Sequence, residues 1–103
     1  MFPMRDFMER FGELLSELDA LAADCDGEAC EDLEDLNAEL EDALLLLGEW
    51  KPEDDAEELA DALEELCALA EDYRALSDRV PGLSDIADRL RMAADMALGN
   101  LER

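Results

Sequence analysis

Carboxylates are the side chains through which this chain could do chemistry: 31 Asp and Glu stand against 8 Lys and Arg, and His is absent. General acid–base catalysis needs a carboxyl group with a shifted pKa in a partly desolvated pocket, and nothing in the pattern indicates a buried acid. Without His, the chain also lacks the usual base that activates a Ser or Cys nucleophile. We therefore predict a binding protein that is not an enzyme and has no cofactor.

Residues 24–31, with the sequence DCDGEACE, resemble parts of two calcium-binding motifs. If Gly27 were the conserved glycine of an EF-hand loop, the first and last ligand positions would fall on Ala22 and Leu33, which have no side-chain oxygen. The segment is also similar to the end of the excalibur-type extracellular calcium motif, but the first Asp of that motif is missing. We therefore predict a plain turn between two helices and no metal site.

Cys25 and Cys30 flank this turn, and Cys67 lies farther along the chain. A Cys-x4-Cys spacing without His does not define a zinc site. The number of cysteines is odd, and residues 1–25 carry acids throughout and lack the apolar core of a signal peptide. We therefore expect reduced thiols in a cytoplasmic protein, with Cys67 as a small core side chain.

The negative charge is concentrated in the middle of the chain. Between Phe11 and Tyr73 there are 24 acids and one base, Lys51, whereas the two flanks hold 7 acids and 7 bases that cancel. The net charge of −23 therefore belongs to one region, and it argues against binding to nucleic acid or to an anionic membrane surface. The longest apolar run, Ala43 to Leu47, is too short to cross a membrane.

Four apolar stripes position these acids. In each stripe, spacings of three and four residues alternate, which is typical of an amphipathic helix. The stripes are Met4, Phe7, Phe11, Leu14, Leu18, Leu21 and Cys25; Ala29, Leu33, Leu36, Leu40, Ala43, Leu47 and Trp50; Ala56, Leu59, Leu63, Leu66, Ala70 and Tyr73; and Ala87, Leu90, Ala94, Ala97 and Leu101. No stretch alternates with period two, so residues 1–103 are predicted to form one all-α domain, an antiparallel up-and-down bundle of about four helices.

Turn-forming residues mark the predicted helix ends. The first helix is expected from about Pro3 to Cys25, with Gly27 as a left-handed cap after it, and the second from about Glu28 to Glu49. The third is expected to start at Pro52, with acids in its first turn, and Ser84 is the expected N-cap of the fourth.

The acids of the two middle helices also repeat every three or four residues, which places them in rows along the helix surface. These rows lack the Lys or Arg at i+4 that stabilises an exposed helix. From Glu28 to Glu49 nine carboxylates follow one another, about one per 3.7 Å of helix axis, close to the ~3.4 Å between phosphates of one DNA strand. The predicted partner-binding residues are Glu28, Glu31, Asp32, Asp35, Glu39, Asp42, Asp54, Glu58, Asp61 and Glu65.

In size, composition and acidic rows the chain resembles the small acidic DNA-mimic inhibitors of phages and mobile elements, anti-CRISPR proteins among them. That resemblance implies an inhibitor that occupies the basic groove of a DNA- or RNA-binding protein in the host cell. A CRISPR effector, a restriction enzyme or another defence nuclease is the expected target. The protein itself is not expected to bind nucleic acid.

Two other functions fit the same pattern. One is an acidic interaction module, such as an antitoxin, an immunity protein or a secretion chaperone, that holds a basic partner. The other is a coiled-coil structural homodimer. The four leucines Leu44–Leu47 cover more than one helix face, so an exposed one would favour a dimer or a partner contact. The favoured interpretation is that all four are buried in a wide core.

Overall fold

The computed structural model describes residues 4–51 and 53–101. It contains four helices, α1 (Met4–Asp24), α2 (Glu28–Glu49), α3 (Ala56–Leu76) and α4 (Leu83–Leu101), and no strand occurs in the described residues. The prediction of an all-α fold with four helices is therefore confirmed.

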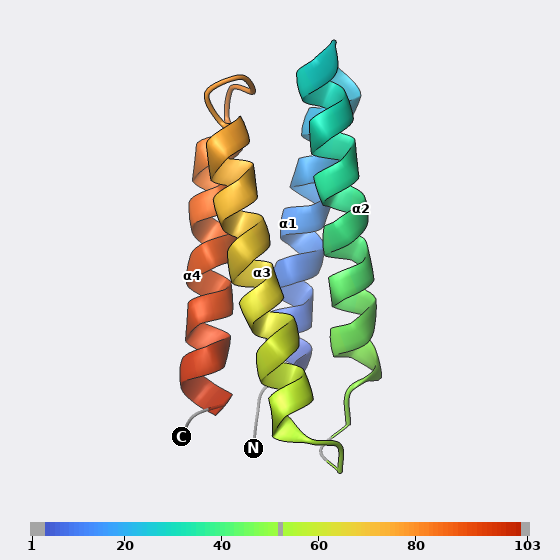
Figure 1. Cartoon of the computed structure of the whole chain (residues 1–103), viewed down its shortest axis with the longest axis vertical. Coiled ribbons are helices and arrows are strands. Elements are labelled where there is room, and N and C mark those ends of the chain that lie inside the picture. The colour runs from blue at the N-terminus through green and yellow to red at the C-terminus, as the bar shows by residue number, and fades with distance from the viewer. Residues whose placement is uncertain (1–3, 52, 102–103) are drawn as a thin grey trace.

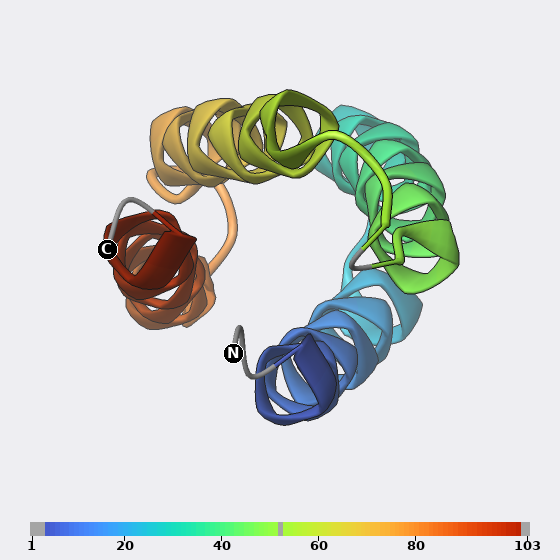
Figure 2. The same cartoon turned by 90° about the horizontal axis from the view of Figure 1, so that it is seen from below.

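The helices form a ring of four (Figures 1 and 2), in which α1 packs against α2 and α4, and α3 packs against α2 and α4. The chain direction alternates from one helix to the next in Figure 1, so that α1 begins and α4 ends at the same end of the molecule. The bundle measures 44 × 20 × 19 Å. We call the boundary between two neighbouring helices a seam. Four seams run along the length of the bundle, and each is lined by outer side chains of two helices.

The apolar stripes meet in the middle of the ring and form one core. The largest fully buried side chains are Phe11, Leu18, Leu33, Leu40, Leu47, Leu59, Leu63, Leu66, Tyr73, Leu83 and Leu90. The closest packing is between α3 and α4, where Ala87, Ala94 and Ala97 are buried on α4 and their small side chains permit a close approach. Isolated helices of this length are marginal in water, so this burial supplies most of their stability.

Asn37 and Tyr73 form a polar link inside the core that the stripes did not predict. The Tyr73 hydroxyl donates a hydrogen bond to Asn37 Oδ1 at 2.8 Å, and Asn37 Nδ2 donates to Asp19 Oδ1 at 3.4 Å. The second stripe had assigned Leu36 to the core, but Asn37 is buried and Leu36 is only half-buried. The reason is that a buried tyrosine hydroxyl needs a partner, and α2 supplies it by turning Asn37 inward.

Two predicted helix starts are wrong. The third helix begins at Ala56, because Asp55 is its N-cap and accepts a hydrogen bond from the Glu57 amide at 3.0 Å. Asp54 therefore lies in the preceding turn, where its Oδ2 accepts from the Lys51 amide at 2.9 Å. The fourth helix begins at Leu83, so Ser84 lies inside its first turn and is not the N-cap. Pro3 and Pro52 lie outside the described residues.

Gly27 does adopt a positive φ of 88°, but with a ψ of −160°, and it is the N-cap of α2. This conformation is open almost only to glycine and is not the left-handed helical one. The prediction of a left-handed cap on the first helix is therefore wrong in its geometry. Gly82, with a φ of 86°, makes a second turn that only glycine adopts readily, just before α4.

The favoured burial of all four leucines Leu44–Leu47 is also wrong. Leu44 and Leu47 are buried, whereas Leu45 is 62% exposed and Leu46 57% exposed. The reason is geometric: successive side chains of a helix are about 100° apart, so four in a row point to nearly all sides of it. In a four-helix ring only the inward part of each helix is covered. Two leucines therefore remain on the surface of α2.

Candidate protein-binding surface

The carboxylates of α2 fall on two different seams of the bundle. Asp32, Asp35 and Glu39 line a shallow groove of about 370 Å³ between α2 and α3, together with Asp72 of α3. Glu34 and Glu41 instead line a groove between α1 and α2, beside Asp19. These rows are close in sequence, but helix geometry directs them to opposite flanks of α2.

The predicted acids of the third segment reach the same seam between α2 and α3, nearer the opposite end of the bundle. Asp54, Glu58, Asp61 and Glu65 line a second groove of about 470 Å³, together with Glu49 at the end of α2. We call the carboxylates of both grooves the acidic seam. It comprises Asp32, Asp35, Glu39, Glu49, Asp54, Glu58, Asp61, Glu65 and Asp72.

The remaining predicted residues lie outside these two grooves. Asp42 is exposed and lies three residues after Glu39, so it continues the same row along α2. Glu28 and Glu31 are exposed in the first turn of α2, where their charges complement the positive end of the helix dipole. All ten predicted acids are exposed.

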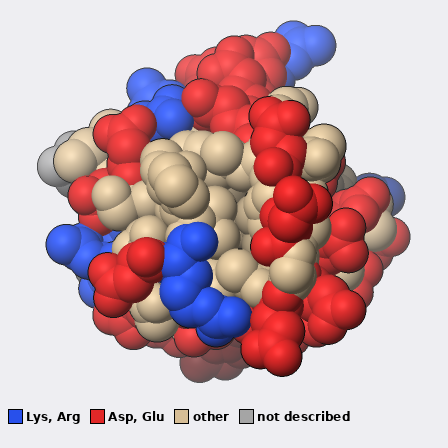
Figure 3. Space-filling view, turned by 90° about the horizontal axis from the view of Figure 1, so that it is seen from above, with Lys and Arg blue, Asp and Glu red and all other residues tan. Residues whose placement is uncertain are grey.

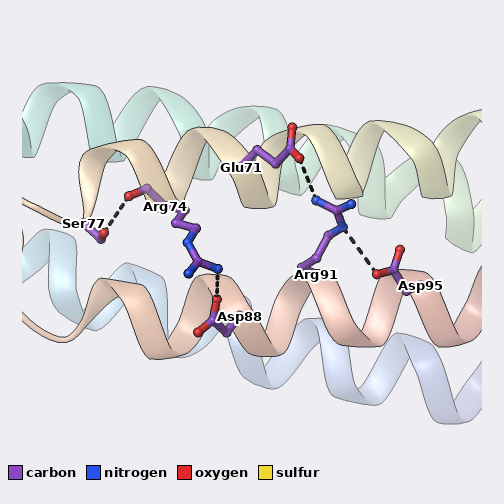
Figure 4. A network of polar contacts seen from close by, with 6 residues as sticks. All are labelled: Glu71, Arg74, Ser77, Asp88, Arg91 and Asp95. Atoms are coloured by element: carbon purple, nitrogen blue, oxygen red, sulfur yellow. Dashed lines mark hydrogen bonds and ion pairs between the residues drawn. The ribbon is translucent and has the colours of Figure 1, made fainter.

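Three of the four arginines that form ion pairs in the described residues do so around α4, away from the acidic seam. Arg74 of α3 pairs with Asp88 at 2.6 Å, and Arg91 of α4 pairs with Glu71 at 2.8 Å and with Asp95 at 3.4 Å, as Figure 4 shows. On the other flank of α4, Arg89 contacts Glu17 of α1 at 3.0 Å and Asp85 at 3.3 Å. The seams on both sides of α4 are therefore largely neutralised.

The acidic seam has one such contact. Arg79 lies 3.5 Å from Asp32, and both side chains are about half exposed. Within residues 4–51 and 53–101, no other ion pair involves a carboxylate of the acidic seam. Like charges at these spacings repel one another, so apart from Asp32 this seam holds charge that no ion pair in the described residues compensates.

Figure 3 views the end of the bundle where α2 begins and α3 ends. Acidic side chains occupy most of the rim around an uncharged centre, and basic side chains form a few separate groups. A partner that approaches this end or the adjoining seam therefore meets mainly negative charge.

The cysteines are poor candidates for a reactive or metal-binding site. All three are free and half-buried. Burial and a 3.5 Å contact with Asp95 raise the pKa of Cys67 to about 11, and a hydrogen bond with the Cys25 side chain, together with burial, raises the pKa of Cys30 to about 11. At neutral pH these two thiols are protonated, and the thiolate is the form that attacks or ligates. No three potential metal ligands gather anywhere in the described part of the chain.

Comparisons with known proteins give no indication of what this surface binds. No protein-family model matches the chain, and neither curated proteins nor solved structures match it. No helix among the described residues is long and apolar enough to cross a membrane.

The set of predicted partner-binding residues left out Leu46, Trp50, Glu49 and Asp72, which line the two grooves. Asp72 continues the predicted acidic row of the third helix, and an exposed leucine among Leu44–Leu47 had been expected to favour a partner contact. Leu46 and Trp50 line the 470 Å³ groove with the acids, although Trp50 had been assigned to a core stripe and is half-buried. A signal for Leu46 was present in the sequence. It lies four residues after Asp42 and so continues the acidic row of α2.

Proposed function

We propose that the protein is a nucleic-acid-mimicking inhibitor that acts by binding, without catalysis, in the cytoplasm of a host cell. Its acidic seam would occupy the basic groove of a DNA- or RNA-binding effector, such as a CRISPR effector or another defence nuclease, and exclude the true ligand. The observation that carries this proposal is the seam between α2 and α3, which holds nine carboxylates and one ion pair, in a bundle where the other ion pairs of the described residues lie around α4.

Physical reasoning connects that observation to the function. An acidic surface kept only for solubility is expected to mix both signs of charge, as the seams beside α4 do. Leaving the carboxylates on both flanks of α2 with a single ion pair lowers the stability of the compact state by self-repulsion. A partner that supplies Lys and Arg would relieve that repulsion. The molecule is 44 Å long, which corresponds to about 13 phosphates at the ~3.4 Å spacing of a DNA strand.

The test is a competition experiment with matched charge variants. Proteins from the native host that bind the immobilised chain at low salt are eluted either with NaCl or with a DNA duplex of about 13 base pairs. We expect elution by both, because a mimic and DNA compete for one basic surface. A captured protein that holds DNA and this chain together would contradict direct mimicry and favour an antitoxin, immunity or chaperone role.

Charge reversal locates the surface. The variant Asp35→Lys, Glu39→Lys, Asp42→Lys should lose binding, while Asp6→Lys, Glu9→Lys, Glu13→Lys should retain most of it. Both variants reverse three exposed, similarly spaced acids, but the second row lies on α1. The first variant spares Asp32, which pairs with Arg79. Equal losses would mean that net charge alone, and not the seam, governs binding.

A further inference from the structure

The 470 Å³ groove between the end of α2 and the start of α3 combines carboxylates of the acidic seam with an apolar lining that includes an exposed leucine and a half-buried tryptophan. Leu46 and Trp50 of the α2 side face Leu59 and Ala62 of α3 across it. Leu46 is 57% exposed, and Trp50 and Ala62 are half-buried. An exposed leucine beside a half-buried tryptophan is the kind of surface that an interaction partner covers.

Carboxylates surround this apolar floor. Glu49 and Asp54 lie at one end of the groove's lining, and Glu58, Asp61 and Glu65 follow along the exposed side of α3. No Lys or Arg lines this groove in the described structure. The complementary ligand is therefore apolar at its centre and positively charged around it. A purely basic surface would match the carboxylates of this groove but not its apolar lining.

We infer that this groove binds a cationic amphipathic helix of the partner protein, whose apolar side chain inserts between Leu46, Trp50 and Ala62 while flanking Lys and Arg meet the carboxylates. An amphipathic helix in a groove is a recurrent mode of recognition, and a volume of about 470 Å³ suits side chains of such a helix. The inference rests on the proposed function in one respect, that this seam meets a basic partner. It adds that affinity includes an apolar contribution that salt does not screen.

The chain contains its own reporter and its own control for this inference. Trp50 is the single tryptophan, so its fluorescence reports occupation of the groove. Leu45 is about as exposed as Leu46. It lies on the other flank of α2, however, because it continues the row of Glu34, Ala38 and Glu41 that lines the groove between α1 and α2. A substitution at Leu45 therefore removes the same kind of side chain from outside the groove.

The experiment uses two synthetic helical peptides of equal charge, one of Lys and Leu and one of Lys and Ala, titrated into the 103-residue chain at low and high NaCl. We expect the Lys–Leu peptide to shift the Trp50 emission and to remain bound at high salt. The Lys–Ala peptide should bind at low salt only. Leu46→Gln should weaken the Lys–Leu peptide about tenfold or more, and Leu45→Gln should leave its affinity unchanged.

Three outcomes would overturn the inference: equal affinity for both peptides at high salt, equal effects of Leu45→Gln and Leu46→Gln, or self-association of the protein that Leu46→Gln abolishes. The last outcome would assign the groove to a second copy of the chain. Because neither peptide is a nucleic-acid-binding protein, failure here leaves the DNA competition result untouched. Conversely, a captured partner that tolerates DNA would contradict mimicry without affecting peptide binding.

Discussion

At the scale of single residues, the core depends on one hydrogen bond between side chains of different helices. Asn37 accepts from Tyr73 and donates to Asp19, so α1, α2 and α3 are joined by one polar chain. Asn37 is the one buried polar residue among the described residues, and the Tyr73 hydroxyl is the polar group that it meets in the core. Such a link favours one register of the helices over others, because any shift would leave buried polar atoms without partners.

Asn37→Ala is expected to lower the free energy of unfolding by about 1–3 kcal/mol, because it leaves the buried Tyr73 hydroxyl without an acceptor. Tyr73→Phe with Asn37→Leu should cost much less, because both polar groups then leave the core together. Urea denaturation of the two variants and the parent measures the difference. Equal destabilisation by both variants would mean that packing, and not the hydrogen bond, accounts for the loss.

Alkaline pH should unfold the protein through the same residue. Burial raises the pKa of Tyr73 above its usual value, and the nearby charges of Asp19 and Glu39 raise it further. The folded state therefore holds this proton more tightly than the unfolded chain, whose tyrosine pKa is about 10. Stability from this group is complete below pH ~10 and falls as the pH rises above that value.

Tyr73 is the only tyrosine, so tyrosinate absorbance follows this group alone. Its titration is expected to coincide with the loss of helical circular dichroism. Ionisation of Tyr73 at its ordinary pKa while the helices remain intact would contradict the burial described above.

At the scale of the helices, α3 begins at an N-cap, Asp55, that the sequence pattern had predicted to lie inside the first turn of the helix. The Asp55 carboxylate accepts from the Glu57 amide at 3.0 Å, and the preceding Asp54 closes the turn with Lys51. This arrangement positions the first turn of α3 beside Trp50, whose Nε1 donates to the Asp55 carbonyl at 3.0 Å. The cap therefore helps to form the apolar groove as well as the helix.

Asp55→Ala is expected to cost about 1 kcal/mol of stability, as loss of an N-cap typically does. Glu53→Ala removes a neighbouring exposed acid that is not a cap and serves as the control. Thermal unfolding measures both. A similar change in melting temperature for the two variants would show that charge, and not capping, determines the effect.

The helices also differ in how their charge is balanced. α2 carries nine carboxylates and no base, whereas α4 carries three carboxylates and two arginines. Exposed ion pairs contribute little to stability, so the arginines around α4 matter chiefly because they neutralise its seams. The division of the surface into a neutralised side and an acidic side follows from this distribution.

At the scale of the whole molecule, a net charge of −23 on a bundle 44 Å long opposes folding. The Debye length falls to about 10 Å at 0.1 M salt, which screens repulsion between helices. The melting temperature is therefore expected to rise as NaCl increases from low to moderate concentration. A flat or falling trend would mean that the acids are neutralised within the bundle or by a bound cation.

Neutralising two carboxylates of the acidic seam, together with Asp42 of the same α2 row, should separate the effect of these charges on stability from their effect on binding. Asp35→Asn, Glu39→Gln, Asp42→Asn is expected to raise the melting temperature at low salt, because three repelling charges are removed, and to weaken capture of the basic partner. Such an exchange of stability for function is common at binding surfaces. A lower melting temperature for this variant would show that the seam carboxylates stabilise the bundle, and would argue against a role confined to binding.

The sequence by itself determined that this protein is all-α with four amphipathic helices. Apolar residues that are alternately three and four positions apart lie on one face of a helix, so only that face of each helix is buried. The sequence also determined the extent of α2, which Gly27 and Trp50 bound. It placed the charge on the outside for the same reason, since every predicted acid lies off the apolar stripe.

Only the tertiary structure decided which acids share a surface. Rows next to each other on α2 separate onto two seams, because a helix in a ring has a different neighbour on each flank. Arginines from α4, from the last turn of α3 and from the turn that follows it determine which carboxylates are paired. The exposure of Leu46 beside Trp50 likewise follows from how far α3 covers α2. Spacing along one chain carries no information on these contacts between helices, because they depend on how the helices are rotated against one another.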